Sequence, residues 1–389
     1  MSALNLETKY DAVIIGGRCA GAATALLLAR SGAKVLLVDR QTDGSDTTST
    51  HALMRGAVIQ LNRWGLDRGL LEAGSPEIRS TTFHYGDEAV RVEIKAEHGV
   101  DYLLAPRRTI LDPLLADAAR RAGATVCHGI ALSELEFAPS SGRVIGVSLR
   151  DANGACATVR SNMVVGADGR HSTVAQSVNA RPYFEGRFCS GLVYGYFEGL
   201  NSTGLHWHFA KNAAAGVIPT NGCHCIFVAV PGPRFGTTFR GDVHEGFLQV
   251  LENTSSGLRT DVSRANQIGR LRGFAGAKAH LRQCQGAGWA LVGDAGYFKD
   301  PLTAHGITDA LRDAQLLSGS IIAGGSRALE RYQEERDALS MPFLRVTEEI
   351  ASFSWDLHEV KQLHSTMSSV MRTEANRIAQ LSTAPSLAA

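Results

Sequence analysis

A glycine-rich segment near the start of the chain has the residue types and spacing of a pyrophosphate-binding loop. It reads Gly16-Gly17-Arg18-Cys19-Ala20-Gly21 and lies between an apolar run, which predicts a strand, and an Ala- and Leu-rich run, which predicts a helix. The backbone N–H groups of such a loop, together with the dipole of the following helix, can hold a pyrophosphate. Asp39 follows Gly21 by eighteen residues, close to the ~20-residue spacing at which a carboxylate meets the ribose of a dinucleotide. We therefore expect Gly16, Gly17, Gly21 and Asp39 to form a dinucleotide site.

Arg18 departs from the usual glycine pattern of such loops. It stands in place of the second glycine, where the backbone approaches the phosphates closely and a Cβ is normally absent. A guanidinium matches the geometry of phosphate, so our hypothesis is that the Arg18 side chain turns outward and adds a contact to the pyrophosphate. The alternative is an arginine that is only solvated.

The elements that must position this loop follow from the hydrophobic pattern. In chain order the pattern predicts a strand at 10–15, a helix at 21–30, a strand at 34–38, helices at 53–64 and 111–121, a strand at 289–292, and a helix from about residue 304. Short β-rich runs with frequent Gly and Pro, at 79–100 and about 183–275, predict antiparallel sheet. The fold class is therefore α/β, with a Rossmann-like domain, an interleaved antiparallel β-sheet domain and a C-terminal helix.

The order of these elements predicts discontinuous domains. We expect a nucleotide-binding domain made of 1–78, 101–180 and 276–340, a β-sheet substrate domain made of 79–100 and 181–275, and a C-terminal helical segment at 341–389. From Phe343 onward apolar residues recur at intervals of three and four, which predicts one long amphipathic helix. This helix is expected to pack on the core; a homodimer contact is the alternative.

Composition excludes several classes of protein. Lys plus Arg number 39 and Asp plus Glu 38, a net charge of +1, so we expect no nucleic-acid partner. The seven cysteines are an odd number scattered through a large chain, which argues against a disulfide framework and for a reducing compartment. The first residues lack the pattern of a signal peptide, and no apolar run reaches the ~20 residues of a membrane span. We expect a cytoplasmic protein.

Two further motifs place an acidic residue directly after a predicted buried strand. They read Val-Val-Gly-Ala-Asp168-Gly169-Arg-His-Ser and Ala-Leu-Val-Gly293-Asp294-Ala-Gly. Together with the first loop, and in this order, they resemble the flavin-dependent monooxygenases typified by para-hydroxybenzoate hydroxylase, and the resemblance spans nearly the whole chain.

The resemblance implies FAD as the cofactor and assigns expected roles. Asp39, with Arg40 beside it, would hold the ADP half of FAD, and Arg108 would contact the flavin cofactor. The middle motif, with Asp168 and Gly169, would serve both FAD and the nicotinamide nucleotide. Asp294 would bind the ribityl chain.

The segment after Gly293 leads through Pro301 to His305 and Gly306, and on into a predicted helix. By resemblance, the N-terminal amides of that helix would face the flavin pyrimidine ring, where reduction places negative charge. A helix N-terminus stabilises an anion by roughly 0.3–1 kcal/mol. His305 would either add to this effect or be an exposed residue of the first turn. The usual family histidine is missing, because Gly296-Tyr297 stand in its place, so the substrate stays open.

A second nucleotide-binding unit is absent from the sequence pattern, which suits enzymes in which NAD(P)H docks transiently, reduces FAD and leaves before O2 reacts. We expect a monooxygenase that hydroxylates or epoxidises a small aromatic, enolic or olefinic substrate. The sequence around Asp300-Pro301-Leu302-Thr303 also resembles that of geranylgeranyl reductases and flavin-dependent halogenases. Reduction of isoprenoid-like double bonds and halogenation are therefore alternatives. Halogenases carry a lysine and a contiguous Trp-x-Trp-x-Ile-Pro segment, and both are missing here. A non-enzymatic flavin-binding protein is the last alternative.

Five residues are candidates for the substrate pocket. His51 and Arg55 follow the Ser/Thr-rich loop where, by resemblance, the chain passes the flavin ring, and Arg55 could hold a carboxylate or phenolate. His206 and His208 alternate around Trp207 and, with Pro219, could line the substrate face of the sheet. A shift of one residue in register would move both histidines to the opposite face, and Arg55 could equally be exposed on its helix.

A metal site is not expected. His206 and His208, and Cys223 and Cys225, are pairs of potential zinc ligands, but neither pair has the usual separation of a metal site.

Overall fold

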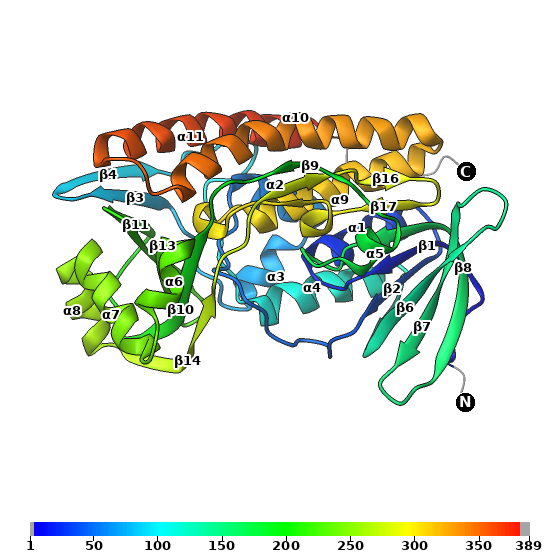
Figure 1. Ribbon diagram of the computed structural model, residues 1–389, viewed down its shortest axis with the longest axis horizontal. Coiled ribbons are helices and arrows are strands. Elements are labelled where there is room, and N and C mark those ends of the chain that lie inside the picture. Colours follow the sequence, from blue (N-terminus) through cyan, green and yellow to red (C-terminus); the bar gives the residue numbers. More distant parts are fainter. Residues whose placement is uncertain (1–3, 382–389) are drawn as a thin grey trace.

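The protein folds around two large β-sheets, and the computed structural model describes its residues 4–381 (Figure 1). In Figure 1 one sheet lies at the right, with β1, β2 and β6 to β8, and the other at the left, with β3, β4, β10, β11, β13 and β14. Two long C-terminal helices run along one side of both. The expected α/β fold class is confirmed.

The first sheet positions the three sequence motifs. Its parallel strands are β5 (Thr125–His128), β2 (Val35–Asp39), β1 (Lys9–Ile15), β8 (Cys156–Gly166) and β17 (Trp289–Leu291), in that spatial order. Strands buried on both faces are near-continuous apolar runs, which is why the sequence pattern shows them clearly. Ile15 pairs with Gly166, and Gly166 pairs with Leu291. The three motifs therefore begin side by side at one edge of the sheet.

Helices cover this sheet, and antiparallel strands extend it. Helices α1 (Cys19–Arg30), α4 (Arg108–Arg121) and α9 (Gly306–Ala323) pack together on it. Its antiparallel strands are β6 (Ile130–Phe137), β7 (Val144–Asp151) and β16 (Gln285–Gly286). Further helices are α2 (Arg55–Trp64), α3 (Asp67–Glu72), α5 (Thr173–Ser177) and α6 (Phe235–Thr238). Most expected helices and strands are present, with bounds within a few residues.

The second sheet has seven strands and two differently covered faces. In spatial order they are β14 (Asn266–Phe274), β10 (Ser190–Glu198), β13 (Cys223–Pro231), β12 (Ala213–Thr220), β11 (Leu205–Ala210), β3 (Ser80–Tyr85) and β4 (Glu88–Glu93). All neighbours are antiparallel except β11 and β3. One face, here called the inner face, packs against the C-terminal helices and the loop before α2. The outer face packs against α7 (Val243–Thr254) and α8 (Ser256–Arg264).

A small sheet links the two halves. It consists of β9 (Pro182–Glu185), β15 (His280–Arg282) and β18 (Tyr297–Phe298). Three short 3-10 helices complete the chain: η1 (Gly232–Arg234), η2 (Gly293–Ala295) and η3 (Pro301–Thr303). The division into domains proposed from the sequence stays an interpretation.

The C-terminal stripe forms two helices, so the expectation of one continuous helix from Phe343 is wrong. Helix α10 (Ser326–Ala351) ends before Phe353, which has a left-handed φ of 53°, and α11 (Leu357–Gln380) starts after Asp356. Asp356 and Glu359 form a capping box that starts the new helix. The apolar spacing continues across the break because both helices bury residues in the same inner-face core. The last residues of the segment 341–389 lie outside the described range.

Among the described residues, no helix combines the length and the apolar character needed to cross a membrane.

Candidate functional site

The three motif loops pack so closely together that only glycine fits at two positions, Gly16 and Gly21. The loops at these positions are here called the glycine cradle. Gly16 has a φ of 107°, and a Cβ there would lie 2.3 Å from the carbonyl oxygen of Ala167 in the middle motif. A Cβ on Gly21 would lie 1.8 Å from the carbonyl oxygen of Gly16. These approaches hold the loop flat against the ends of β1 and β8, as phosphate-binding loops require.

Asp39 and the start of α1 supply the donors and acceptors of a dinucleotide site. The Asp39 carboxylate is buried and accepts hydrogen bonds from the backbone N–H groups of Gly17 at 2.6 Å and Gln41 at 2.7 Å. No side chain caps the N-terminus of α1, so its first N–H groups are free for an anion. Arg40 follows Asp39 and is exposed. The donor set fits the pyrophosphate and ribose of FAD.

The Arg18 side chain is bound to other residues of the protein, which excludes the alternative of an arginine that contacts only solvent. Its guanidinium donates hydrogen bonds to the Ser45 carbonyl oxygen at 2.6 Å and to the Asp112 carboxylate at 2.9 Å. These three residues line a small surface pocket together with Asp39 and His128. Arg18 therefore spans the mouth of the expected dinucleotide site.

Asp112 is a residue that the sequence analysis missed. It accepts two hydrogen bonds from Arg108, both at 3.0 Å, and one from the Cys19 thiol at 3.1 Å. Burial by itself lowers the pKa of Arg108, but Asp112 raises it above the ordinary value, so the guanidinium stays charged. The detectable signal was the spacing of four residues between Arg108 and Asp112, which brings them together on a helix.

The acidic residues of the second and third motifs are both half-buried. Asp168 accepts hydrogen bonds from the N–H groups of Thr173 at 2.7 Å and Val174 at 3.3 Å through one oxygen. Its other oxygen, Oδ1, is buried and lacks a hydrogen-bond partner within the described part of the chain. Burial raises the pKa of Asp294 to about 6, although Lys299 and Arg108 oppose the shift. Both carboxylates retain capacity to bind a polar group such as a ribityl or ribose hydroxyl. Gly169 and Gly293, with φ of 79° and 60°, make the turns beside them.

Helix α9 begins with a rigidly held N-terminus. Pro301 opens η3, and the carboxylate of Asp300 accepts hydrogen bonds from the Leu302 N–H at 2.9 Å and the Ser190 N–H at 2.6 Å. The Thr308 hydroxyl accepts a hydrogen bond from the Met54 N–H at 3.2 Å. The start of α9, from Gly306, is therefore fixed to the second sheet and to the loop that carries His51.

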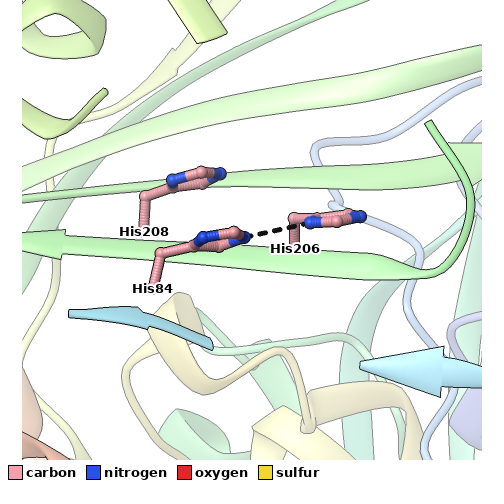
Figure 2. Close-up of side chains that lie close together, drawn as sticks. All are labelled: His84, His206 and His208. Atoms are coloured by element: carbon pink, nitrogen blue, oxygen red, sulfur yellow. Dashed lines mark hydrogen bonds between the residues drawn. The ribbon is translucent and has the colours of Figure 1, made fainter. Parts of the chain in front are cut away.

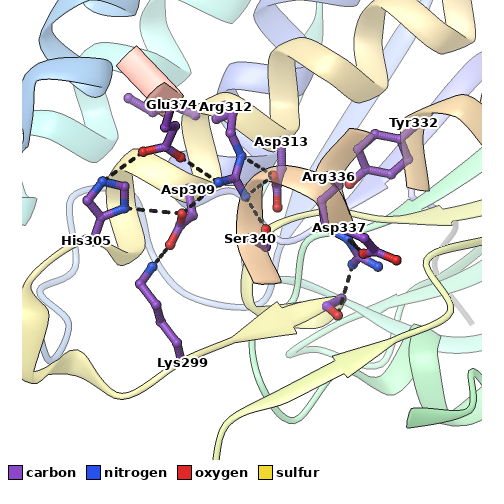
Figure 3. A network of polar contacts seen from close by, with 12 residues as sticks. Lys299, His305, Asp309, Arg312, Asp313, Tyr332, Arg336, Asp337, Ser340 and Glu374 are labelled. Atoms are coloured by element: carbon purple, nitrogen blue, oxygen red, sulfur yellow. Dashed lines mark hydrogen bonds and ion pairs between the residues drawn. The ribbon is translucent and has the colours of Figure 1, made fainter. Parts of the chain in front are cut away.

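His305 is buried at this helix start, which excludes the alternative of an exposed histidine. Its ring does not cap the helix but lies between the carboxylates of Asp309 at 3.2 Å and Glu374 at 3.0 Å. Figure 3 shows these groups joined to Arg312, which binds Asp309 at 3.0 Å and Glu374 at 2.5 Å, and to Lys299, which pairs with Asp309.

The positive and negative side chains of this network neutralise one another. Burial lowers the pKa of Lys299 to about 7. Burial would raise the pKa of Glu374, but His305 and Arg312 lower it to about 2. Arg312 also donates to the Ser340 hydroxyl of α10 at 2.8 Å. The network thus joins α9, α10 and α11 behind the expected flavin position.

His51 lies in a buried polar cluster on the inner face of the second sheet. Its Nε2 hydrogen-bonds the Tyr196 hydroxyl, and its Nδ1 is buried and lacks a partner within residues 4–381. The Arg107 guanidinium lies 3.5 Å from the centre of the Tyr196 ring, and its Nε is likewise buried and unpartnered among those residues. Burial, followed by the charges of Arg108 and Arg107, lowers the pKa of His51 to about 3. The sequence analysis missed Arg107 and Tyr196.

The other pocket candidates lie away from this cluster. Arg55 donates to the Val100 carbonyl oxygen at 2.9 Å and lies 3.8 Å from Glu97. Trp207 belongs to the inner-face core, so His206 and His208, one residue to either side of it, lie on the outer face. Pro219 alternates with Ile218 of the inner-face core and also lies on the outer face.

Comparisons with known proteins identify the family. The FAD binding domain family matches residues 9–347, so the chain belongs to this family. It is a flavin-dependent oxidoreductase with FAD as its cofactor, and those expectations are confirmed.

The chain is similar to enzymes with different activities. It is 24% identical over 368 residues to the chloroplastic geranylgeranyl diphosphate reductase of Arabidopsis thaliana, covering 87% of this chain and 73% of that protein. It is 24% identical over 351 residues to the uncharacterized aromatic compound monooxygenase YhjG of Bacillus subtilis, covering 87% and 68%. It is 25% identical over 366 residues to tryptophan 2-halogenase of Chondromyces crocatus, covering 90% and 69%.

Solved structures share the fold. They include the flavin-dependent brominase Bmp2, with a TM-score of 0.79 at 17% identity and coverage of 96% and 93%. The p-nitrophenol 4-monooxygenase PnpA of Pseudomonas putida gives 0.78 at 17% identity, with coverage of 97% and 99%. PqsL of Pseudomonas aeruginosa in complex with 2-aminobenzoylacetate gives 0.75 at 18% identity, with coverage of 94% and 100%.

Proposed function

We propose that the protein is an FAD-dependent monooxygenase that uses NAD(P)H and O2 to hydroxylate or epoxidise a small aromatic, enolic or olefinic compound. Its relatives include monooxygenases, reductases and halogenases. The choice among these activities therefore depends on the side chains of the pocket.

The cluster of His51, Tyr196 and Arg107 carries the proposal. It combines an aromatic ring, a guanidinium and a neutral imidazole, and two of its nitrogens are buried without partners in the described residues. Buried polar atoms are normally hydrogen-bonded, so unpaired ones mark a place where a polar ligand belongs. A phenolate or enolate matches this set, because Arg107 offers positive charge and the unpartnered Nδ1 of the neutral His51 ring can form a hydrogen bond with the ligand.

The cluster is next to the residues expected to hold FAD. Arg107 directly precedes Arg108, and the charge of Arg108 acts on both His51 and Asp294. Bound FAD supplies the redox chemistry, taking electrons from NAD(P)H and passing them to O2. The protein's own residues orient the substrate through Arg107 and through a hydrogen bond at His51 Nδ1, and the buried side chains of His51 and Tyr196 exclude water.

Two observations disfavour halogenation. Strand β3, Ser80–Tyr85, contains no lysine. In β12, Ile218-Pro219 would end a Trp-x-Trp-x-Ile-Pro segment, but Ala214 and Gly216 stand at the two tryptophan positions. A side chain at Gly216 is excluded, because its Cβ would lie 2.1 Å from the Phe227 ring. The charged and hydrogen-bonding groups of the cluster likewise disfavour the apolar tunnel expected of an isoprenoid reductase.

Product labelling tests the proposal. FAD-loaded protein is mixed with NADH or NADPH under ¹⁸O2, with 4-nitrophenol and 2-aminobenzoylacetate as first members of a panel of phenols and enols. We expect ligand-stimulated oxidation of the nicotinamide and one ¹⁸O atom in the product. Halide-dependent products would favour a halogenase, and a saturated product formed without O2 would favour a reductase.

Substitutions then connect the activity to the cluster. His51→Gln removes the Nδ1 that faces the ligand, and we expect kcat to fall about 10-fold or more, because a hydrogen bond to a charged group contributes about 1.5–3 kcal/mol. Tyr183→Phe is the control, because Tyr183 is an exposed aromatic residue outside the cluster. An unchanged kcat in His51→Gln contradicts the role of His51.

A further inference from the structure

Three histidines from two strands meet on the outer face of the second sheet (Figure 2). His206 and His208 lie two residues apart in β11, so both side chains leave the same face. Strand β3 pairs with β11 in parallel and places His84 directly beside His208. His84 is 122 residues from His206 in the sequence, which is why the sequence analysis found only a pair and expected no metal.

The ring nitrogens of the three histidines are close together. One nitrogen from each residue lies within 4.8 Å of the others. His84 Nε2 and His206 Nδ1 are 3.1 Å apart, and the rings of His84 and His208 are parallel with centroids 4.1 Å apart. A tetrahedral zinc ion binds histidine nitrogen at about 2.0–2.1 Å, which separates the ligating nitrogens by about 3.4 Å. The three rings are nearly parallel, with interplanar angles of 2° and 20°, so the rings must turn about their side-chain bonds for the three lone pairs to converge on one ion.

The hydrogen bonds of His206 leave its Nδ1 as the nitrogen that can bind a metal ion. Its Nε2 lies 2.9 Å from the carbonyl oxygen of Thr203 and therefore carries a proton that it donates. Its Nδ1 then carries a lone pair that accepts a hydrogen bond from His84 Nε2–H, and for both nitrogens to bind a metal ion that proton moves to Nδ1 of His84. Histidine ligands in metal sites typically donate their second N–H to a carbonyl or carboxylate in this way.

The three imidazoles are also free of competing charges. In the described part of the chain, no ion pair or hydrogen bond joins the three rings to a charged side chain. Neutral imidazole is the form that binds metal ions.

A second cluster of possible ligands in the same protein does not meet these conditions. His305, Asp309 and Glu374 are equally close together. However, Arg312 binds both carboxylates, and Lys299 pairs with Asp309. These cations already compensate the negative charge, so the cluster is a closed internal network.

We propose that His84, His206 and His208 form a binding site for a divalent transition-metal ion, with zinc as the best match. Three histidines with a water molecule in the fourth position are a known donor set for zinc. His84 and His206 are only half-buried, so an ion reaches the site from solvent. The site lies across the sheet from His51 and Tyr196 and is independent of the proposed monooxygenase reaction. A bound ion would join β3 to β11 at the only parallel pairing of this seven-stranded sheet.

Zinc binding by the holoenzyme tests the proposal. FAD-loaded protein without a polyhistidine tag is treated with chelator, dialysed and titrated with Zn²⁺ in a calorimeter, and bound metal is measured by mass spectrometry after desalting. We expect one zinc per chain and a higher Tm, because a ligand that binds only the folded state stabilises it. We expect His206→Ala and His208→Ala each to weaken binding at least tenfold.

His224→Ala is the matched control. His224 is a half-buried histidine on the outer face of the same sheet, and its Nε2 already pairs with the Ser202 carbonyl oxygen at 2.9 Å. The proposal is overturned if the wild type retains no zinc, if His208→Ala binds zinc as tightly as wild type, or if His224→Ala loses binding equally.

Cobalt provides a readout that needs no variant. If the histidine variants fail to fold, Co²⁺ is added to the wild-type holoenzyme and the visible spectrum is recorded beyond the flavin bands. An intense ligand-field absorption indicates a tetrahedral site and supports the proposal. A weak spectrum, typical of octahedral hydrated cobalt, contradicts it.

Discussion

Arg18 of the glycine-rich loop donates a 2.9 Å hydrogen bond to Asp112 of α4, although the two residues are 94 positions apart. Asp112 also binds Arg108, so one carboxylate faces two guanidiniums beside the expected pyrophosphate position. One carboxylate cannot neutralise both cations, and the remaining positive charge favours a bound anion. This supports the hypothesis that Arg18 helps to hold the pyrophosphate of FAD.

Replacing Arg18 tests that hypothesis. A hydrogen bond to a charged group contributes about 1.5–3 kcal/mol, so we expect Arg18→Ala to weaken FAD binding about 10-fold or more. Flavin fluorescence titration of the apoprotein measures the change. Arg121→Ala, at the exposed end of α4, serves as the control. If Arg18→Ala binds FAD as tightly as wild type, Arg18 has no role in holding the cofactor.

The glycine cradle predicts a sharp contrast between two Gly→Ala substitutions in helices. A methyl group on Gly21 would lie 1.8 Å from the Gly16 carbonyl oxygen, whereas nothing lies within 4 Å of a Cβ on Gly319. We expect Gly21→Ala to abolish FAD binding or folding. Gly319→Ala, at an exposed position of α9, should stabilise the protein by about 0.4–1 kcal/mol. Thermal unfolding and FAD content distinguish the two, and retention of FAD by Gly21→Ala would contradict the cradle.

Buried histidines predict that stability falls in mild acid. Burial lowers the pKa of His51, His208 and His364 to about 3, from 6.5 in the unfolded chain. The unfolded state therefore binds more protons as pH falls below about 6.5, and each histidine removes about 1.4 kcal/mol per pH unit from there toward pH 3. Urea unfolding at several pH values measures this slope.

His364→Gln isolates one of these contributions. Glutamine does not titrate and can still hydrogen-bond the Tyr85 hydroxyl, which lies 2.9 Å from His364 Nδ1. We expect the pH slope of the unfolding free energy to fall by about 1.4 kcal/mol per unit. His358→Gln, at an exposed position of α11, should leave the slope unchanged. Equal slopes for wild type and His364→Gln would show that His364 is protonated in the folded protein.

The charge network behind α9 predicts a large loss of stability from a single truncation. Glu374→Ala removes the carboxylate that binds Arg312 at 2.5 Å and His305 at 3.0 Å. Removing one partner of a buried ion pair typically costs about 3–5 kcal/mol. Lys34→Ala, which breaks an exposed pair with Glu7, should cost about 1 kcal/mol or less. Urea unfolding compares them, and equal losses would contradict the importance of the network.

The sequence by itself determined the dinucleotide loop and the class of cofactor. Buried parallel strands are continuous apolar runs, and Gly21 is required by a close backbone approach to Gly16 within one short βαβ unit. Local patterns of this kind can be recognised from the sequence alone. The break between α10 and α11 did not, because the apolar stripe continues through the turn at Phe353.

Only the tertiary structure decided which side chains meet. The face of β11 that carries His206 and His208 depends on strand register, which periodicity alone leaves open. Asp112, Arg107 and Tyr196 join their partners across 94, 89 and 145 positions, respectively. His84 reaches His206 across 122 positions for the same reason. Such contacts arise when strands and helices distant in the sequence pack together, so their chemistry is defined by the fold rather than by spacing along the chain.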